Sequence, residues 1–184
     1  ELQALLAGES FELTTPGQEG LSLDVKESGE TLDDNAAKKA IAFSEASGLP
    51  ALADDSGLFI DHLDGAPGVH SARYAGPDAS DADRVALVLE RLNGVPTEER
   101  TACFRAVIAI ATPDKTPLYA HGECCGIISI VPSGKNGFGY DPIFVFPEYE
   151  KTMAELDSTL KNAVSHRGRA IKAALPALRL LFSK

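Results

Sequence analysis

The chain has 184 residues, enough for one domain or for two small lobes. It carries 17 Lys and Arg residues against 27 Asp and Glu residues, a formal net charge of −10. This charge argues against a protein that coats nucleic acid or an anionic membrane, because phosphate surfaces select for clustered basic residues. The apolar share of 44% and the charged share of 24% are ordinary for a folded domain and exclude global disorder. No apolar run approaches the roughly 18 residues of a membrane span.

The first half of the chain alternates short apolar runs with helical patterns. Leucines at helical spacing predict a helix over 1–7, and alternating apolar residues predict a short strand over 11–13. A sequence resembling a capping box opens a predicted helix over 31–47. Apolar runs at 49–53 and 58–63 flank the sequence Asp-Asp-Ser-Gly, which predicts two strands joined by a tight turn.

The second half contains the strongest strand signals. Long β-like runs at 101–112 and 118–131 are separated by a Pro-Asp-Lys turn, so we expect them to pair antiparallel. The composition of 65–80 predicts a long loop, and the apolar periodicity of 81–92 predicts a helix. The remaining expected elements are a glycine-rich loop at 133–142, a strand at 143–146, and a helical C-terminal third that Pro176 bends or breaks. Together these patterns predict a mixed α/β fold with long antiparallel strands.

The cysteines are Cys103, Cys124 and Cys125. An odd number with two adjacent residues is a poor disulfide framework, and no C-x-x-C pair indicates a zinc site. We interpret all three as reduced, partly buried thiols of a cytoplasmic protein.

Two acidic segments have the residue types of a metal site. Asp54 and Asp55 directly follow an apolar run, and carboxylates held there can bind Mg²⁺ or orient a water molecule. Glu27 precedes the helix over 31–47, whose Lys38 and Lys39 can pair with phosphate. The same residues are also typical of a plain turn and of a solvated helix face.

Two further segments have the residue types of a purine site. The glycines of 133–142 let the backbone approach a ligand, and Phe138 and Tyr140 can stack on a flat ring. Lys161, His166 and Arg167 are hydrogen-bond donors that can read base oxygens and neutralise phosphate charge. A simple glycine turn and a charged helix end are the alternative interpretations of these two segments.

Four ordered motifs then carry a resemblance to a known family. The sequences ADDSGL (53–58), GAPGVHSARYAG (65–76), GFGYDPIF (137–144) and SHRG (165–168) resemble those of the inosine triphosphate pyrophosphatase family. The similarity extends along the whole chain with matching spacing. Members of that family hydrolyse ITP, dITP and XTP to the monophosphate and pyrophosphate with Mg²⁺, and thereby cleanse the nucleotide pool.

The resemblance implies a fold and a set of site residues. It implies an elongated two-lobed α/β domain over 1–184, with a long mixed or antiparallel central sheet flanked by helices and the nucleotide in the cleft between the lobes. It also implies a homodimer, which adds to the cytoplasmic location expected from the cysteines and to the absence of nucleic-acid and membrane partners expected from charge and hydropathy. The implied roles are proton acceptor and metal contact for Asp55, support for Asp54, metal contact for Glu27, and substrate contacts for Ser56, Lys38, Phe138, Gly139, Tyr140, Asp141, Lys161, His166 and Arg167.

Base selectivity is expected to follow from the purine edge. Hypoxanthine and xanthine carry an oxygen at position 6, where adenine carries an amino group. Donors such as His166 and Arg167 satisfy that oxygen, and they would be left unpaired by adenine.

The sequence departs from the family pattern at its start. The family opens with a strand and a Thr/Ser-x-Asn-x-x-Lys loop that grips the triphosphate, and the printed sequence contains neither. We expect that the printed sequence is truncated; a chain without this loop would instead be a nucleotide-binding relic that lacks turnover. A related pyrophosphatase that prefers pyrimidine triphosphates is the other alternative, and the SHRG and FGYDP motifs argue against it.

Overall fold

The computed structural model describes residues 2–113 and 115–182, and the chain divides into two compact units. Unit 1 comprises 1–55, 106–122 and 166–184, and unit 2 comprises 56–105 and 123–165. Three of the four unit boundaries fall within the three longest strands, and the fourth, after Ser165, falls between two helices.

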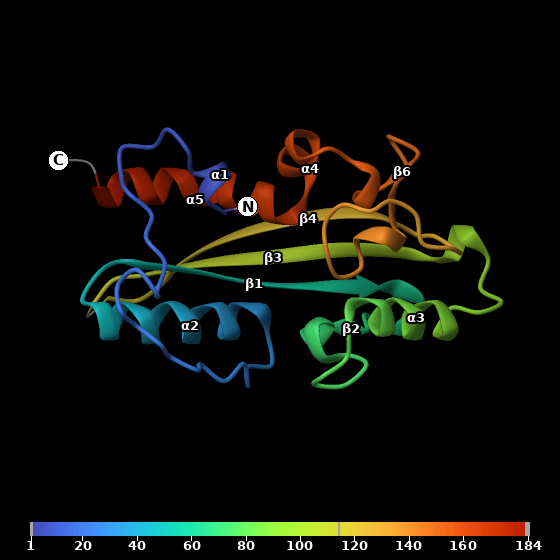
Figure 1. Ribbon diagram of the computed structural model, residues 1–184, viewed down its shortest axis with the longest axis horizontal. Coiled ribbons are helices and arrows are strands. Elements are labelled where there is room, and N and C mark those ends of the chain that lie inside the picture. The colour runs from blue at the N-terminus through green and yellow to red at the C-terminus, as the bar shows by residue number, and fades with distance from the viewer. Residues whose placement is uncertain (1, 114, 183–184) are drawn as a thin grey trace. The chain divides into compact units, whose positions relative to one another are not determined.

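Within the described ranges, six strands hydrogen-bond in the order β2-β1-β3-β4-β5-β6 (Figure 1). The pairs β1–β2, β4–β5 and β5–β6 are antiparallel, with Leu58 opposite Gly68, Ile128 opposite Phe144 and Val145 opposite Thr152. The strands are β1 (Ala51–Ile60), β2 (Pro67–Gly68), β3 (Thr101–Ala111), β4 (Leu118–Ile128), β5 (Phe144–Phe146) and β6 (Lys151–Thr152). The predictions of a mixed α/β fold and of the two long strands are confirmed.

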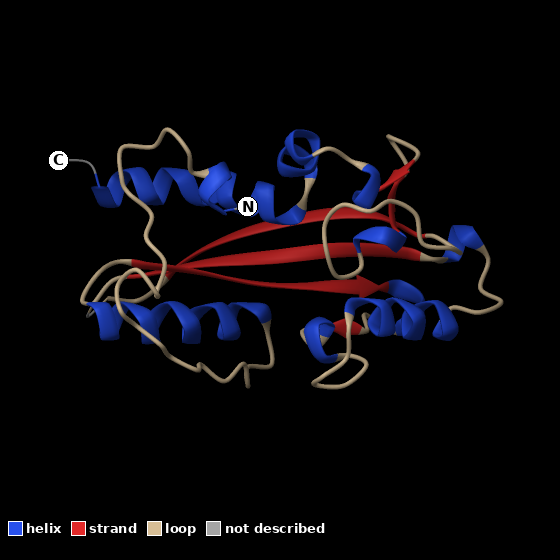
Figure 2. Cartoon of the chain, viewed as in Figure 1, coloured by secondary structure: helices blue, strands red, loops and turns tan. Residues whose placement is uncertain are grey.

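The prediction of two strands around the Asp-Asp-Ser-Gly sequence is wrong, because β1 continues through it (Figure 2). Although these residues are turn formers, Asp54 and Asp55 are held in the extended strand by basic partners from unit 1. Gly57 allows β2 to approach closely, since a Cβ atom there would lie 2.3 Å from the Gly68 carbonyl oxygen.

In unit 1, helices lie on both sides of its strand segments (Figure 1). Helix α2 (Leu32–Ser47) begins as predicted, with the Thr31 hydroxyl accepting a hydrogen bond from the Asp34 N–H, and ends at Gly48 with φ of 70°. Helix α5 (His166–Phe182) continues through Pro176, so the proline does not break it, and it packs a stripe of small and branched residues against β3 and β4. The short α1 (Leu2–Leu5) packs against the same apolar cluster.

The strand predicted over 11–13 is not formed. Phe11 and Leu13 instead lie in irregular backbone and pack their side chains against the apolar cluster of α5 and β3. The alternation that predicted a strand therefore reflects two anchoring residues of a surface segment.

Unit 2 has its own core. Helix α3 (Asp81–Arg91) begins with a capping box between Ser80 and Asp83 and buries Val85 and Val88. Together with Leu92, they pack on an apolar cluster formed by β1, β3, β4 and β5 and by the turns before α4 (Ser158–Val164). No helix in the described ranges is both long enough and apolar enough to cross a bilayer.

The interpretation of three reduced cysteines is also corrected. Cys103 on β3 and Cys125 on β4 form a disulfide with a Cα–Cα distance of 4.0 Å, and Cys124 is a buried free thiol. Successive strand residues point to opposite faces of the sheet. Cys124 therefore points into the core, whereas Cys125 points to the other face, where it pairs with Cys103 of the neighbouring strand.

Candidate active site

Two carboxylates converge on one ammonium group in unit 1. The Lys39 Nζ donates to Glu27 Oε1 at 2.8 Å and to Asp55 Oδ1 at 3.0 Å. Asp55 is 9% exposed on β1, whereas Lys39 and Glu27 are half-buried. Two acids and one base leave the cluster with a net charge of −1, which is a favourable environment for a further cation.

Helix α2 contributes two residues to this cluster, Asn35 and Lys39, which lie one turn apart and both contact Asp55. The Asn35 amide donates to Asp55 Oδ2 at 3.3 Å, and its oxygen accepts the Gly29 N–H at 2.7 Å. Asn35 is fully buried beside Ala36 and Ala40, so the helix face that carries it is packed. The amide therefore joins the segment that bears Glu27 to the strand that bears Asp55.

The electrostatics of the cluster raise the pKa of Asp55. Burial is the largest cause, and the charge of Glu27 adds to it, while Lys39 and Asn35 oppose the shift. For Lys39, burial acts to lower the pKa, but its hydrogen bonds and charge interactions with Glu27 and Asp55 outweigh burial and raise it. Lys39 therefore stays an ammonium ion, and Asp55 binds a proton more readily than an ordinary aspartate does.

The donor set fits a hard divalent cation. Carboxylate oxygens are the ligands that Mg²⁺ prefers, and those of Glu27 and Asp55 already surround one positive charge. Lys39 marks the position at which positive charge is stabilised. These two carboxylates are the residues that would hold a metal in unit 1.

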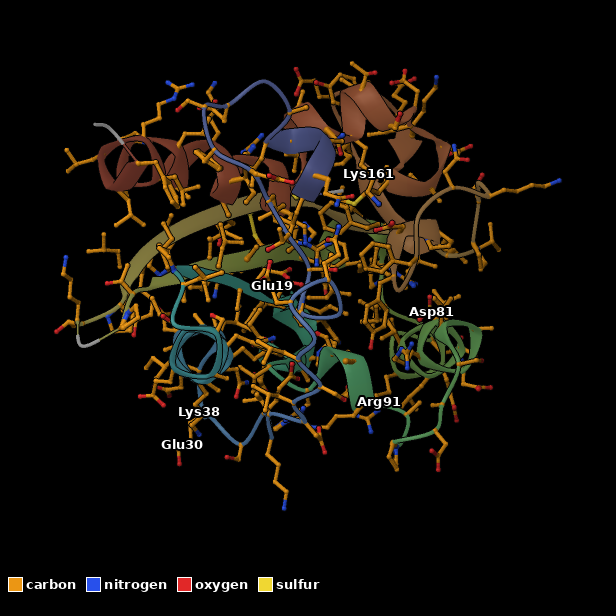
Figure 3. All side chains as sticks on the ribbon, turned by 60° about the vertical axis from the view of Figure 1, so that its left-hand side comes forward. Glu19, Glu30, Lys38, Asp81, Arg91 and Lys161 are labelled. Carbon is orange, nitrogen blue, oxygen red and sulfur yellow. A yellow bond between two sulfur atoms is a disulfide. The ribbon has the colours of Figure 1, made fainter. Side chains whose placement is uncertain are left out.

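Lys38, the lysine expected at the triphosphate, does not contact this cluster. Its Nζ donates to the Ser28 hydroxyl at 3.1 Å, and its side chain is exposed and points away from the body of unit 1 (Figure 3). Sequence reasoning named Lys39 only as a lysine that can pair with phosphate and gave no role to Asn35, whereas the structure joins both to Asp55. Their spacing of four places both on the helix face that also carries the buried Ala36 and Ala40, a signal present in the sequence.

A second carboxylate of β1 holds one of the predicted base-reading donors. Arg167 Nε and Nη2 both donate to Asp54 Oδ2 at 2.8 Å. Arg167 lies in the first turn of α5, after the buried His166. Gly122 on β4 allows this close packing, because a Cβ atom there would lie 2.1 Å from the His166 carbonyl oxygen. Asp54 thus orients Arg167, while Asp55 faces the Lys39 cluster.

Unit 2 holds the glycine-rich loop. Phe138 is 55% exposed, with the Lys161 ammonium 5.0 Å from its ring centroid. Asp141 is 3% exposed and accepts both the Phe138 N–H at 2.9 Å and the Lys161 Nζ at 2.6 Å. The loop therefore presents an aromatic ring and an ammonium group together.

Tyr140 does not present a ring for stacking. Its side chain is 4% exposed within the core of unit 2, and its hydroxyl donates to the Ser71 carbonyl at 2.9 Å. Burial raises the pKa of this phenol above its ordinary value. Of the two aromatic residues expected at the base, Phe138 alone is exposed. Ser56 is half-buried on β1 at the start of unit 2.

A cavity of about 440 Å³ also opens in unit 1. Its lining is largely apolar and includes Phe43, Leu52, Ile110 and Leu178, with charged groups at Lys39, Asp54 and two glutamates. Apolar walls suit hydrophobic side chains and do not stabilise a highly charged triphosphate. Lys39, the centre of the acid cluster, and Asp54 are the polar part of the cavity lining that also belongs to the ion pairs described above.

Comparison with known proteins identifies relatives of the whole chain. Residues 1–177 match the sequence profile of the Ham1 family. The dITP/XTP pyrophosphatase of Desulforamulus reducens is 48% identical over 99% of this chain and 90% of its own length, and that of Geobacter sulfurreducens is 50% identical over 93% and 86%. A HAM1 protein structure from Coxiella burnetii superimposes with a TM-score of 0.89 at 45% identity, covering 97% of this chain and 91% of the other.

Proposed function

Because this chain belongs to the Ham1 family, we propose that it is a nucleoside triphosphate pyrophosphatase that hydrolyses dITP, XTP and ITP. Its relatives with about half of their residues identical are dITP/XTP pyrophosphatases. The reaction consumes one water and breaks the anhydride bridge between the α- and β-phosphates. The products are a nucleoside monophosphate and pyrophosphate.

The Asp55–Lys39–Glu27 cluster is the observation that supports this function most strongly. Attack by water on phosphorus needs an acceptor for the water proton, and the raised pKa of the Asp55 carboxyl suits that role. Lys39 holds the Asp55 carboxylate in one orientation from 3.0 Å and compensates part of the charge that develops on the phosphate oxygens.

Mg²⁺ is the proposed cofactor, and Glu27 and Asp55 are its proposed protein ligands. When bound, the ion would neutralise charge on the phosphate oxygens and favour departure of pyrophosphate. A net charge of −1 in the cluster favours a divalent cation from solution, because the cation removes the repulsion between the two carboxylates.

Hydrogen-bond donors and one aromatic ring are the proposed contacts to the base. Arg167, oriented by Asp54, and the neighbouring His166 are assigned to the oxygen at position 6 of the purine. Phe138 is assigned to the face of the ring, with Lys161 beside it. Leaving such donors unpaired is the proposed reason why ATP is a poor substrate.

The remaining proposals rest on the resemblance to the family. They are that the two units act as lobes of one domain, that the protein forms a homodimer, and that it acts in the cytoplasm.

Phosphorus NMR of the reaction products tests the proposed function. The protein is incubated with dITP and Mg²⁺, and the expected products are dIMP and pyrophosphate. Asp55→Asn is the matched variant, since it keeps the size of the side chain and removes its ability to accept a proton; it should abolish the reaction. Formation of dIDP and orthophosphate, or unchanged turnover by Asp55→Asn, would contradict the proposal.

A further inference from the structure

The glycine loop of unit 2 is held by a carboxylate that lies far away in the sequence. Asp81, the first residue of α3 (Figure 3), accepts the backbone N–H of Gly139 at 2.7 Å. We propose that Asp81 is a positioning residue for substrate binding, which fixes the loop that presents Phe138. This inference deepens the proposed function and rests on it.

The loop is held at three consecutive residues. The Phe138 N–H is bound by Asp141 at 2.9 Å, the Gly139 N–H by Asp81, and the Tyr140 hydroxyl is anchored on Ser71. Asp141 belongs to the loop itself, and Tyr140 sits in the core. Asp81 ties the Gly139 backbone to α3, while Lys161 of α4 contacts the Phe138 ring and the Asp141 carboxylate.

Gly139 is the residue at which this contact matters most. Its φ of 61° lies in the left-handed region, where glycine is free of the penalty that a side chain would bring. Such freedom also lets the backbone leave that conformation easily. A charge-assisted hydrogen bond to the Gly139 N–H restricts it, and so restricts the direction in which the neighbouring Phe138 points.

Asp81 is itself fixed and charged. Arg84, one turn later on α3, contacts its carboxylate and also donates to the carbonyl oxygens of Ala72 at 2.9 Å and Ala79 at 2.6 Å. The Gly139 hydrogen bond, followed by Arg84, lowers the pKa of Asp81, so that it is a carboxylate at neutral pH. Arg84 thereby links the segment before α3 to the loop through Asp81.

The first turn of α3 also provides a matched control. Asp83 has the same charge and lies two residues further, but its carboxylate binds the Ser80 hydroxyl and N–H at the helix start. Within the part of the chain that the structure describes, Asp81 and not Asp83 accepts the Gly139 N–H. Asp83→Ala therefore weakens the helix start and leaves the loop contact in place.

The test compares Asp81→Ala, Asp81→Asn and Asp83→Ala by steady-state kinetics with ITP. We expect Asp81→Ala to raise KM about tenfold while kcat changes by less than about twofold, as for loss of one charge-assisted hydrogen bond. Asp81→Asn retains an acceptor oxygen and should recover part of the loss. Asp83→Ala should leave KM unchanged. Equal KM values for Asp81→Ala and Asp83→Ala would overturn the proposal.

Hydrogen exchange at the Gly139 amide, measured without nucleotide, separates this inference from the proposed function. Exchange should be faster in Asp81→Ala than in the wild-type protein and unchanged in Asp83→Ala. Unchanged exchange in Asp81→Ala would overturn the positioning role even in an active enzyme. Faster exchange together with no pyrophosphate release by the wild-type protein would instead overturn the proposed function, and with it the assignment of this loop to substrate.

Discussion

Replacing Lys39 by methionine isolates the charge at the centre of the acid cluster. Lys39→Met keeps the length and most of the packing of the side chain and removes the ammonium group that Glu27 and Asp55 share. The two carboxylates then repel each other with no cation between them. Lys38→Met is the matched control, because it removes an adjacent ammonium group of α2 that donates to the Ser28 hydroxyl and not to the acid pair.

The expected loss of stability in Lys39→Met follows from the burial of the ion pairs that Lys39 makes. Removing one partner of a buried ion pair destabilises a protein by about 3–5 kcal/mol. The Lys39 side chain is 20% exposed and that of Glu27 35%, so solvent screens part of the loss. We expect Lys39→Met to lower the free energy of unfolding by about 2–3 kcal/mol, or Tm by about 4–12 °C. Lys38→Met should change it by less than about 0.5 kcal/mol.

Urea denaturation with and without Mg²⁺ measures the free energy of unfolding of both variants. Mg²⁺ should stabilise Lys39→Met more than it stabilises the wild-type protein, because the ion supplies the missing positive charge to Glu27 and Asp55. Equal destabilisation by Lys39→Met and Lys38→Met would refute the view that Lys39 compensates the acid pair. Stability of Lys39→Met that is insensitive to Mg²⁺ would refute the assignment of this pair to a metal.

Three further predictions concern other parts of the molecule. Arg167→Ala should raise KM for ITP and narrow the selectivity for ITP over ATP in steady-state kinetics; an unchanged ITP:ATP ratio would mean that the base is read elsewhere. Burial raises the pKa of Asp55, so Mg²⁺ binding measured by calorimetry should weaken as the pH falls through a value above that of an ordinary aspartate. Without metal, stability should fall as the pH rises from the pKa of an ordinary aspartate to the raised pKa of folded Asp55, because over this range the folded protein binds more protons than the unfolded chain. Asp55→Asn should therefore be at least as stable as the wild type at neutral pH without metal, and a clear loss of stability would contradict this sign. Reducing the Cys103–Cys125 disulfide should lower the free energy of unfolding by about 2–4 kcal/mol, and the same loss should be seen in Cys124→Ser. Three reactive thiols in the denatured, unreduced protein would show that the disulfide is absent.

Local patterns in the sequence predicted the helices and strands whose apolar side chains recur at regular spacing. Helix α3 and strands β3 and β4 were found because their apolar residues recur with the period of the structure that they form. The start of α2 was found because Thr31 caps its own helix. In each case the determining contacts lie within the element or within a few residues of it.

The errors arose where distant partners decide the outcome. Turn-forming residues of β1 remain extended because Lys39 and Arg167, which lie 16 and 113 residues away from their acidic partners, neutralise Asp55 and Asp54. The Cys103–Cys125 pairing depends on the register of two strands, which the count of cysteines does not contain. Tyr140 was expected in the site because aromatic residues suit a base, yet its hydroxyl has a backbone partner inside the core.

The candidate site was predicted at the level of motifs more readily than at the level of single lysines. The acidic, glycine-rich and donor segments were chosen from residue type and order. Recognising Lys39 as the partner of Asp55 required the buried face of α2, which the fully buried Asn35 marks one turn earlier. Helical periodicity applied to polar residues, and not only to apolar ones, would have identified that contact.

Substrate selectivity tests the central claim most directly. Pyrophosphate release is measured over a panel of ITP, dITP, XTP, GTP, ATP, dTTP and UTP, with Mg²⁺ and with a chelator, and kcat/KM is compared across the panel. The account predicts Mg²⁺-dependent release that is greatest for ITP, dITP and XTP and much weaker for ATP. Preference for dTTP or UTP, or equal rates for ITP and ATP, would contradict it.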